Sequence, residues 1–191
     1  MRARTSRVIF LLIFAIFITC LARPGYGQNA EDLNGKNVDP FHGASGKAVV
    51  LIFLRTDCPI SNRYAPTIQQ LSARYSGQAT FWLVYPDKKT SAAAIRKYLL
   101  DYGYKLPALR DPQGILVRQG RVQVTPEVAV FDARARLVYH GRIDNWYEDF
   151  GRSRSEPTTH DLDDAIRSTL SGRPPVAAVT EAVGCYISDL Q

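Results

Sequence analysis

The segment Lys47–Leu54 (KAVVLIFL) constrains the fold of this chain more than any other feature. It is almost continuously apolar and rich in β-branched residues, and it shows no alternation between apolar and polar positions. A strand of this kind is buried on both faces, as happens in a parallel or mixed sheet that helices cover on each side. The segment therefore predicts the central strand of an α/β domain.

Helical and extended patterns alternate after this strand. Apolar residues at helical spacing predict a helix over residues 59–75, which Gly77 ends. Ala79–Tyr85 (ATFWLVY) predicts a second strand, and Thr90 is expected to cap a helix that ends before Gly103. The order to this point is strand, helix, strand, helix.

The second half of the chain adds a hairpin and a last helix. Asp111–Gly114 is expected to form a turn, and Val128–Phe131 and Leu137–His140 to form two strands of a hairpin. Thr158 and Asp161 fit a capping box, and the apolar residues after them follow helical spacing. The complete order is that of a thioredoxin-like fold, with a central mixed sheet flanked by helices.

Shorter segments complete the chain. The Asn34-Gly35 pair favours a tight turn and predicts a short N-terminal ribbon, whereas residues 171–191 form a tail with no clear element. Because no repeat or long linker interrupts residues 28–170, we expect one domain there. Ala135 stands in a tight turn where a positive φ would favour glycine, so we expect a turn of another type.

The N-terminus has the pattern of a secretory signal. Three arginines precede the apolar run Val8–Ile18, and small residues follow up to Gly27. The run is short for a membrane span, so we expect cleavage that removes residues 1–27, with uncleaved anchoring as the alternative. The residues before Cys20 do not favour a lipoprotein site. The protein is thus predicted to be exported, to the periplasm or another extracytoplasmic space, with membrane contact only if the segment stays.

The signal segment also explains much of the positive charge. The full chain has a formal charge of +6, and residues 1–27 carry four of its 24 basic side chains and none of its 18 acidic ones. The remaining charge is close to neutral, so the composition gives no reason to expect a nucleic-acid partner.

Two cysteines remain after the signal segment, and one has a distinctive position. Cys58 follows the central strand directly and precedes Pro59, which fits the first turn of a helix. That position favours a thiolate through unpaired backbone N–H groups and the helix dipole. Arg55 and Arg63 add positive charge, while Asp57 opposes ionisation unless it points away. We expect the sulfur of Cys58 to be exposed and reactive at the edge of the sheet. The alternative is that Cys58 is a buried filler residue.

The sequence around Cys58 resembles exported redoxins of the TlpA/ResA and AhpC/TSA-like group. The likeness rests on residues 46–54 followed by Arg-Thr-Asp-Cys-Pro-Ile-Ser, and on Pro66 eight residues after the cysteine. The resemblance implies an active thiol at Cys58. It also implies a cis peptide bond between Thr125 and Pro126 that shapes a substrate groove, with an ordinary trans proline as the alternative.

One position departs from the family pattern. Ser61 stands where the second cysteine of a Cys-x-x-Cys motif would fall, so the usual local resolving thiol is missing, and Ser61 is expected to hydrogen-bond the thiolate. The other thiol is Cys185 in the tail. It is predicted to resolve a bond formed on Cys58, to form a permanent disulfide worth about 4–5 kcal/mol of loop entropy, or to stay unpaired.

The leading prediction is a thiol–disulfide oxidoreductase that acts on protein or small-molecule thiols and disulfides. A peroxiredoxin-like peroxidase acting on peroxide is the second hypothesis, although Leu51 and Arg55 replace the proline and the hydroxyl residue of that pattern. The third is a redox-inert binding domain. Asn62 fills the second cysteine position of a Sco-like copper motif, and three scattered histidines lack ligand spacing, so we expect no metal and no cofactor.

The loop 142–156 concentrates aromatic and arginine side chains. It could form a partner surface near the site. The favoured prediction is that its aromatics pack under the loop and that its arginines are solvated or pair with Asp144, Glu148 and Asp149.

Overall fold

The computed structural model describes residues 30–44 and 46–187. The predicted signal segment lies outside the described residues. Within them, no helix has the length and apolar character needed to cross a membrane. The helices are α2 (Pro59–Arg63), α3 (Ala65–Arg74), α4 (Ala92–Asp101), α5 (Ile115–Gly120) and α6 (Asp161–Leu170). The strands are β1 (Ala30–Asp32), β2 (Asn37–Val38), β3 (Ala48–Phe53), β4 (Ala79–Tyr85), β5 (Ala108–Arg110), β6 (Val124–Thr125), β7 (Glu127–Phe131), β8 (Leu137–Gly141), β9 (Tyr147–Asp149), β10 (Arg152–Ser153) and β11 (Cys185–Tyr186).

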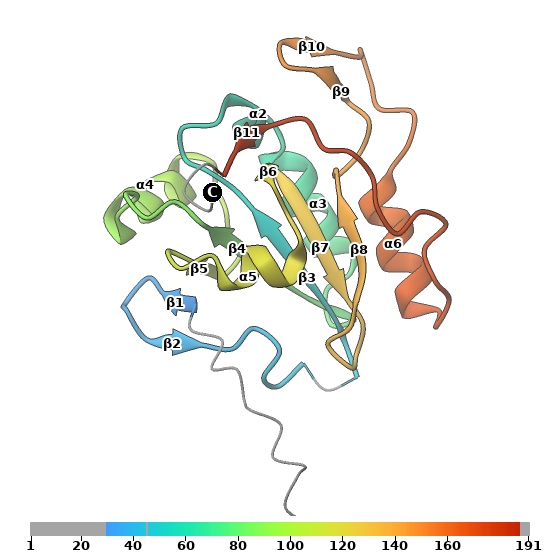
Figure 1. Ribbon diagram of the computed structural model, residues 1–191, viewed down its shortest axis with the longest axis horizontal. Coiled ribbons are helices and arrows are strands. Elements are labelled where there is room, and N and C mark those ends of the chain that lie inside the picture. Colours follow the sequence, from blue (N-terminus) through green and yellow to red (C-terminus); the bar gives the residue numbers. More distant parts are fainter. Residues whose placement is uncertain (1–29, 45, 188–191) are drawn as a thin grey trace, which may run out of the picture.

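A mixed sheet forms the centre of the molecule (Figure 1). Its strand order is β2-β1-β5-β4-β3-β7-β8, with β3 parallel to β4 and antiparallel to β7. The predicted N-terminal ribbon is present as the antiparallel pair β1–β2. The thioredoxin-like fold expected from the order of elements is therefore confirmed.

The central strand β3 is buried along its whole length, as its composition predicted. Successive side chains of a strand point to opposite faces of the sheet. Val50 and Ile52 accordingly pack in the core with apolar residues of α3, α4 and α6, while Leu51 and Phe53 pack in a second cluster with α5. Helices on both faces thus hold β3 in place, and its end fixes where the next residues emerge.

The helix predicted over residues 59–75 is divided in two. It breaks at Tyr64, between α2 and α3. Pro66 accounts for the break, because proline has no N–H to donate to the carbonyl of Asn62 and its ring clashes with that carbonyl. The break leaves α2 as a short turn of helix directly after Cys58.

Two predicted helix caps are wrong. Ser91, not Thr90, caps α4, and its hydroxyl accepts the N–H of Ala94 at 3.1 Å. Thr158 does not cap α6, which begins at Asp161. The reason is a competing contact, since Asn145 binds both the N–H and the hydroxyl of Thr158 at 2.8 Å.

The expectation about Ala135 is also wrong. This residue does adopt a positive φ, of 56°. The carboxylate of Asp132 stabilises the turn, because it accepts the N–H groups of Arg134 and Arg136 at 2.9 and 3.0 Å. Side-chain hydrogen bonds therefore hold an alanine where glycine would be favoured.

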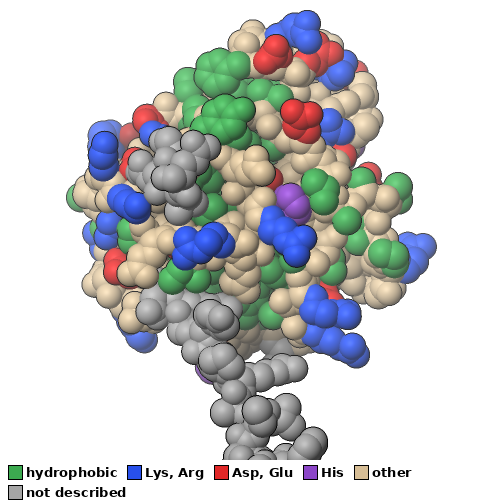
Figure 2. Space-filling model, in the orientation of Figure 1, with side chains coloured by type: hydrophobic (Ala, Val, Ile, Leu, Met, Phe, Trp, Pro, Cys, Tyr) green, Lys and Arg blue, Asp and Glu red, His purple; other side chains and the backbone are tan. Residues whose placement is uncertain are grey.

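The tail contains structure that the sequence pattern did not predict. Beyond α6 it crosses the edge of β8, where Val179 bridges His140, and it ends in β11, which pairs with β6. Figure 1 shows this path, in red, returning from α6 to the neighbourhood of α2. Figure 2 shows Lys and Arg side chains spread around the visible face rather than gathered in one patch.

Candidate functional site

Cys58 lies where the sequence predicted it, between the end of β3 and the first turn of α2. It is the N-cap residue, Pro59 follows at the first helical position, and the carbonyl of Cys58 accepts the N–H of Asn62 at 3.2 Å. The expectation that its sulfur would be exposed is wrong, because the residue is 0% exposed. The physical reason is that Cys58 packs in the core cluster with residues such as Tyr98, while Val183 and Cys185 of the tail pack against that cluster.

The peptide bond between Thr125 and Pro126 is cis, as expected from the resemblance. The carbonyl oxygen of Thr125 accepts a hydrogen bond from the thiol of Cys58 at 3.1 Å. Two residues that are distant in sequence therefore meet at one edge of the sheet.

Strand β11 brings the second cysteine to the same place. Cys185 pairs in register with Thr125, whose hydroxyl donates to the carbonyl of Cys185 at 3.4 Å. The two cysteines are in the free thiol state, with Cys58 buried and Cys185 partly buried. The predicted proximity of the two thiols is thus present in the geometry.

The two thiols have opposite ionisation behaviour. Burial raises the pKa of Cys58, but hydrogen bonds from the Cys185 thiol and from the N–H and hydroxyl of Ser61 favour its thiolate, and the net effect lowers the pKa. Burial and the neighbouring Cys58 raise the pKa of Cys185 to about 12. The surroundings therefore favour a thiolate at Cys58, to which the thiol of Cys185 donates a hydrogen bond.

Ser61 occupies the position expected for it, one turn of α2 after Cys58. It is 0% exposed, and its hydroxyl has no hydrogen-bond partner of regular geometry among the described residues while Cys58 is a thiol. Its contribution to the lowered pKa of Cys58 arises when the sulfur becomes an anion and can accept. A hydroxyl with a partner in only one charge state favours that state.

Arg55 connects the segment before Cys58 to the tail. Its guanidinium binds both carboxylate oxygens of Asp57 at 3.0 Å and donates to the carbonyl of Tyr186 at 3.3 Å. The charge of Asp57 is therefore paired. Arg63, the other predicted source of positive charge, stacks over the ring of Trp146 at 5.7 Å.

Glu127 is a residue of the site that the sequence analysis missed. It is 5% exposed, and its carboxylate accepts the N–H groups of Gln123 and Val124 at 2.7 and 3.2 Å. These bonds fix the segment that carries Thr125. A signal was available, because Glu127 places a charged residue between Pro126 and an otherwise apolar strand.

The three histidines are apart. His42 and His160 are exposed, and the ring of His140 lies 3.4 Å from the carboxylate of Glu127. Among residues 30–44 and 46–187, no group of three or more His, Cys, Asp or Glu side chains is arranged to hold a metal ion.

The family comparison covers the part of the chain that carries Cys58. The model of the AhpC/TSA family matches residues 26–140, more than half of the chain, and this range includes Cys58, Ser61 and the Thr125–Pro126 bond. The chain belongs to the AhpC/TSA family. The redoxin resemblance drawn from the sequence is therefore confirmed. Among curated proteins, none gives a significant match.

Solved structures share the fold of this AhpC/TSA protein. A hypothetical protein from Sinorhizobium meliloti 1021 is 21% identical, with a TM-score of 0.71 over 83% of this chain and 88% of that one. An uncharacterized conserved protein from Geobacillus kaustophilus is 22% identical, with a TM-score of 0.72 over 83% and 86%. The exposed lipoprotein thioredoxin Etrx1 from Streptococcus pneumoniae is 22% identical, with a TM-score of 0.54 over 75% and 96%. At these identities the likeness concerns the fold.

The AhpC/TSA match ends before the tail. Cys185 lies beyond residue 140, so the second thiol belongs to a part of the chain that the family model does not cover. Only the structure connects that part to Cys58.

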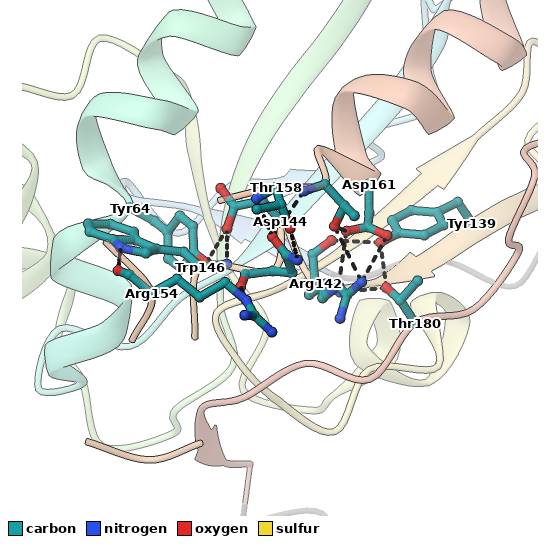
Figure 3. Close-up of polar contacts among 11 residues, drawn as sticks. Tyr64, Tyr139, Arg142, Asp144, Trp146, Arg154, Thr158, Asp161 and Thr180 are labelled. Atoms are coloured by element: carbon teal, nitrogen blue, oxygen red, sulfur yellow. Dashed lines mark hydrogen bonds and ion pairs between the residues drawn. The ribbon is translucent and has the colours of Figure 1, made fainter. Parts of the chain in front are cut away.

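The loop 142–156 of this AhpC/TSA protein packs against the helices beside the site (Figure 3). The hydroxyl of Tyr64 donates to the carboxylate of Asp144 at 2.6 Å, and that carboxylate also accepts the N–H of Trp146 at 2.9 Å. The ring of Trp146 stands edge-on to that of Tyr64, while Phe150 is 63% exposed. The prediction that the aromatic side chains pack under the loop is therefore correct for Trp146 and wrong for Phe150.

The arginines of the loop form ion pairs with carboxylates, and some of these carboxylates differ from the expected ones. Arg142 binds Asp161 at 2.9 Å rather than Asp144, and Arg152 and Arg154 both bind Glu148. Asp144 instead accepts the hydrogen bonds of Tyr64 and Trp146 through its Oδ1.

Proposed function

We propose that this AhpC/TSA protein is an extracytoplasmic thiol–disulfide oxidoreductase in which Cys58 attacks and Cys185 resolves. The observation that carries the proposal is the pairing of β11 with β6, which brings a protonated Cys185 beside the Cys58 sulfur, whose surroundings favour a thiolate. A nucleophile and a second thiol in contact are what a two-step exchange needs.

The reaction runs in two balanced steps. The thiolate of Cys58 attacks one sulfur of a disulfide RS–SR, forms a mixed disulfide and releases RS⁻. Cys185 then gives up its proton, attacks the Cys58 sulfur and releases the second RS⁻. The substrate gains two electrons, and the protein is left with a bond between Cys58 and Cys185.

Neighbouring groups support these steps. The hydroxyl and N–H of Ser61 stabilise the attacking thiolate. The carbonyl of Thr125 accepts a hydrogen bond from the Cys58 thiol in the resting state, and the cis bond to Pro126 holds that carbonyl at the edge of the site. These are positioning roles, since the sulfur atoms carry the chemistry.

Export is part of the proposal. The N-terminal segment 1–27 supports it as a secretory signal, followed by the domain 28–170 and the tail 171–191. The pneumococcal protein Etrx1, which shares this fold, is an exposed lipoprotein thioredoxin. Disulfides persist in extracytoplasmic compartments, where a Cys58–Cys185 bond formed on turnover would be stable.

A small model disulfide tests the chemistry. We expect fully reduced protein mixed with bis(2-hydroxyethyl) disulfide to form the Cys58–Cys185 bond and to retain no hydroxyethyl thiol, as measured by intact-mass and peptide mass spectrometry. Cys185→Ser should instead accumulate one hydroxyethyl thiol on Cys58. Cys58→Ser, the matched control at the other sulfur, should lose the reaction.

Two other outcomes would replace the proposal. A Cys58–Cys185 bond that survives mild reductant and never turns over would assign the pair a structural role. Rapid oxidation by hydrogen peroxide, with no reaction toward the disulfide, would assign a peroxidase.

A further inference from the structure

The burial of Cys58 raises the question of what can reach it. The sulfur sits at the edge of the sheet, yet the residue is 0% exposed. Residues 178–187 form a single extended segment that we call the strap, and its Val183 and Cys185 pack against the core cluster that contains Cys58. The strap itself is largely exposed or half-buried along its length.

The first attachment of the strap is at β8. The backbone of Thr180 donates to the carbonyl of His140 at 3.2 Å, and its hydroxyl contacts the hydroxyl of Tyr139 at 2.6 Å and accepts the N–H of Arg142 at 3.1 Å (Figure 3). Gly141 allows the strap to approach β8 this closely, since a Cβ there would collide with the Thr180 backbone. This end is held by several specific bonds.

The second attachment lies beside the site. Gly184 packs so closely on Thr125 that a Cβ would collide with its carbonyl oxygen. Arg55 binds the carbonyl of Tyr186 at 3.3 Å, and the side chain of Ile187 is buried in the second core cluster. The strand at this end has only two residues, so its local opening is expected to be easier than unfolding of the domain.

A strand at this place has a consequence for substrates. The backbone edge of β6 next to Cys58 is occupied by β11, so another polypeptide cannot pair there while the strap is closed. Opening the strap would admit such a chain, but it would also carry Cys185 away from Cys58. The closed form therefore keeps both thiols together and leaves no backbone edge for a large partner.

We propose that the closed strap makes Cys58 selective for low-molecular-weight disulfides and excludes folded proteins. The inference rests on the proposed function, and it assigns that function a substrate class. The small molecule needs only a brief, local displacement at Gly184, whereas a protein disulfide needs β11 to detach completely.

Two maleimides of equal chemistry and different size test the strap. In the Cys20→Ser, Cys185→Ser double variant, which leaves Cys58 as the one cysteine of the chain, we compare the labelling rates of N-ethylmaleimide and of a polyethylene-glycol maleimide. The rate with the small maleimide is divided by the rate with the large one, and this size ratio is compared with the size ratio of the same protein in denaturant. We expect the folded protein to exceed that reference by about tenfold or more.

Variants test whether the strap causes the size dependence of Cys58 labelling. Gly184→Ala adds one methyl group at the contact with Thr125, and its φ lies outside the left-handed region, so the change acts through space alone. It should bring the ratio close to the denatured reference. Ile187→Ser, which removes the buried apolar side chain of the second attachment from a cluster that does not contain Cys58, should act in the same direction. Val176→Ala is the matched control, because Val176 is fully exposed, and it should leave the ratio unchanged.

The outcomes separate this inference from the proposed function. A size ratio in the folded protein equal to the denatured reference would overturn the inferred role of the strap. A high ratio that neither Gly184→Ala nor Ile187→Ser lowers would overturn it as well. Failure of the wild-type protein to form the Cys58–Cys185 bond with a small disulfide would overturn the proposed function, whatever the ratio.

Discussion

The ionisation of Cys58 depends on a few individual atoms. Its burial would by itself keep the thiol neutral, and the helix α2 is too short to offer more than its first N–H groups. The balance is decided by Cys185 and Ser61, which donate to the thiolate. A serine in place of the second cysteine thus keeps a donor at that position, while in the proposed mechanism the resolving thiol lies in the tail.

Ser61→Ala tests this balance. We expect the variant to raise the pKa of Cys58, because the thiolate loses a donor, and to slow its alkylation at neutral pH. The measurement is the pH dependence of the thiolate ultraviolet absorbance, with Cys58→Ser defining the background. The free energy of unfolding at acidic pH should not fall, since the Ser61 hydroxyl has no partner beside a neutral thiol. An unchanged titration would show that Ser61 does not act on the sulfur.

Buried tyrosines give a matched pair of opposite predictions. The hydroxyl of Tyr98 has no hydrogen-bond partner among the described residues, so Tyr98→Phe should raise the free energy of unfolding, by about 1 kcal/mol. The hydroxyl of Tyr64 donates to the buried Asp144, so Tyr64→Phe should lower it by about 1–3 kcal/mol. Urea unfolding of the two variants measures both, and equal signs would contradict the assignment.

At the scale of elements, the turn between β7 and β8 carries a conformational cost. Ala135 adopts a φ of 56°, which glycine reaches without the clash of a Cβ. Ala135→Gly should therefore raise the free energy of unfolding by about 0.5–1 kcal/mol. Ala133→Gly, in the same turn without a positive φ, should lower it by a similar amount. Thermal unfolding that shows a loss in both variants would refute the argument.

The elements differ in how far the sequence could predict them. Strand β3 and the helices beside it follow from local hydrophobic patterns, so their order and the place of Cys58 were predictable. Local patterns could also have shown the break at Tyr64, through Pro66. Strand β11 could not be found in this way, because two residues have no periodicity and their pairing depends on Thr125, far away in the sequence.

The same limit applies to the site. The position of Cys58 and the cis bond before Pro126 were predictable from the motif, but the burial of the sulfur was not. Burial is a property of what packs around a residue, and here two of the packing residues, Val183 and Cys185, belong to a tail whose composition suggests no structure. The contact of Gly184 with Thr125 likewise exists only once the chain has closed on itself.

At the scale of the whole molecule, buried phenol and thiol groups that the fold keeps protonated govern the free energy of unfolding at alkaline pH. Burial raises the pKa of Tyr75 and Cys185 to about 12, and it raises the pKa of Tyr64, Tyr85 and Tyr98 further. A raised pKa contributes stability that is fully present below the unfolded pKa and is lost as pH rises through the folded one. Cys58, whose pKa is lowered, acts in the opposite sense and adds stability as pH rises toward its unfolded value.

The free energy of unfolding of the reduced protein should therefore fall steeply above about pH 10, where the unfolded tyrosines ionise. Each tyrosine that stays protonated in the folded state contributes at most about 1.4 kcal/mol per pH unit to this slope. Tyr85 is 1% exposed, so Tyr85→Phe should make the slope shallower in urea unfolding across this range. Tyr186→Phe, at a residue 71% exposed, is the control and should leave it unchanged. Equal slopes in the wild type and Tyr85→Phe would mean that this phenol ionises as readily in the folded protein as in the unfolded chain.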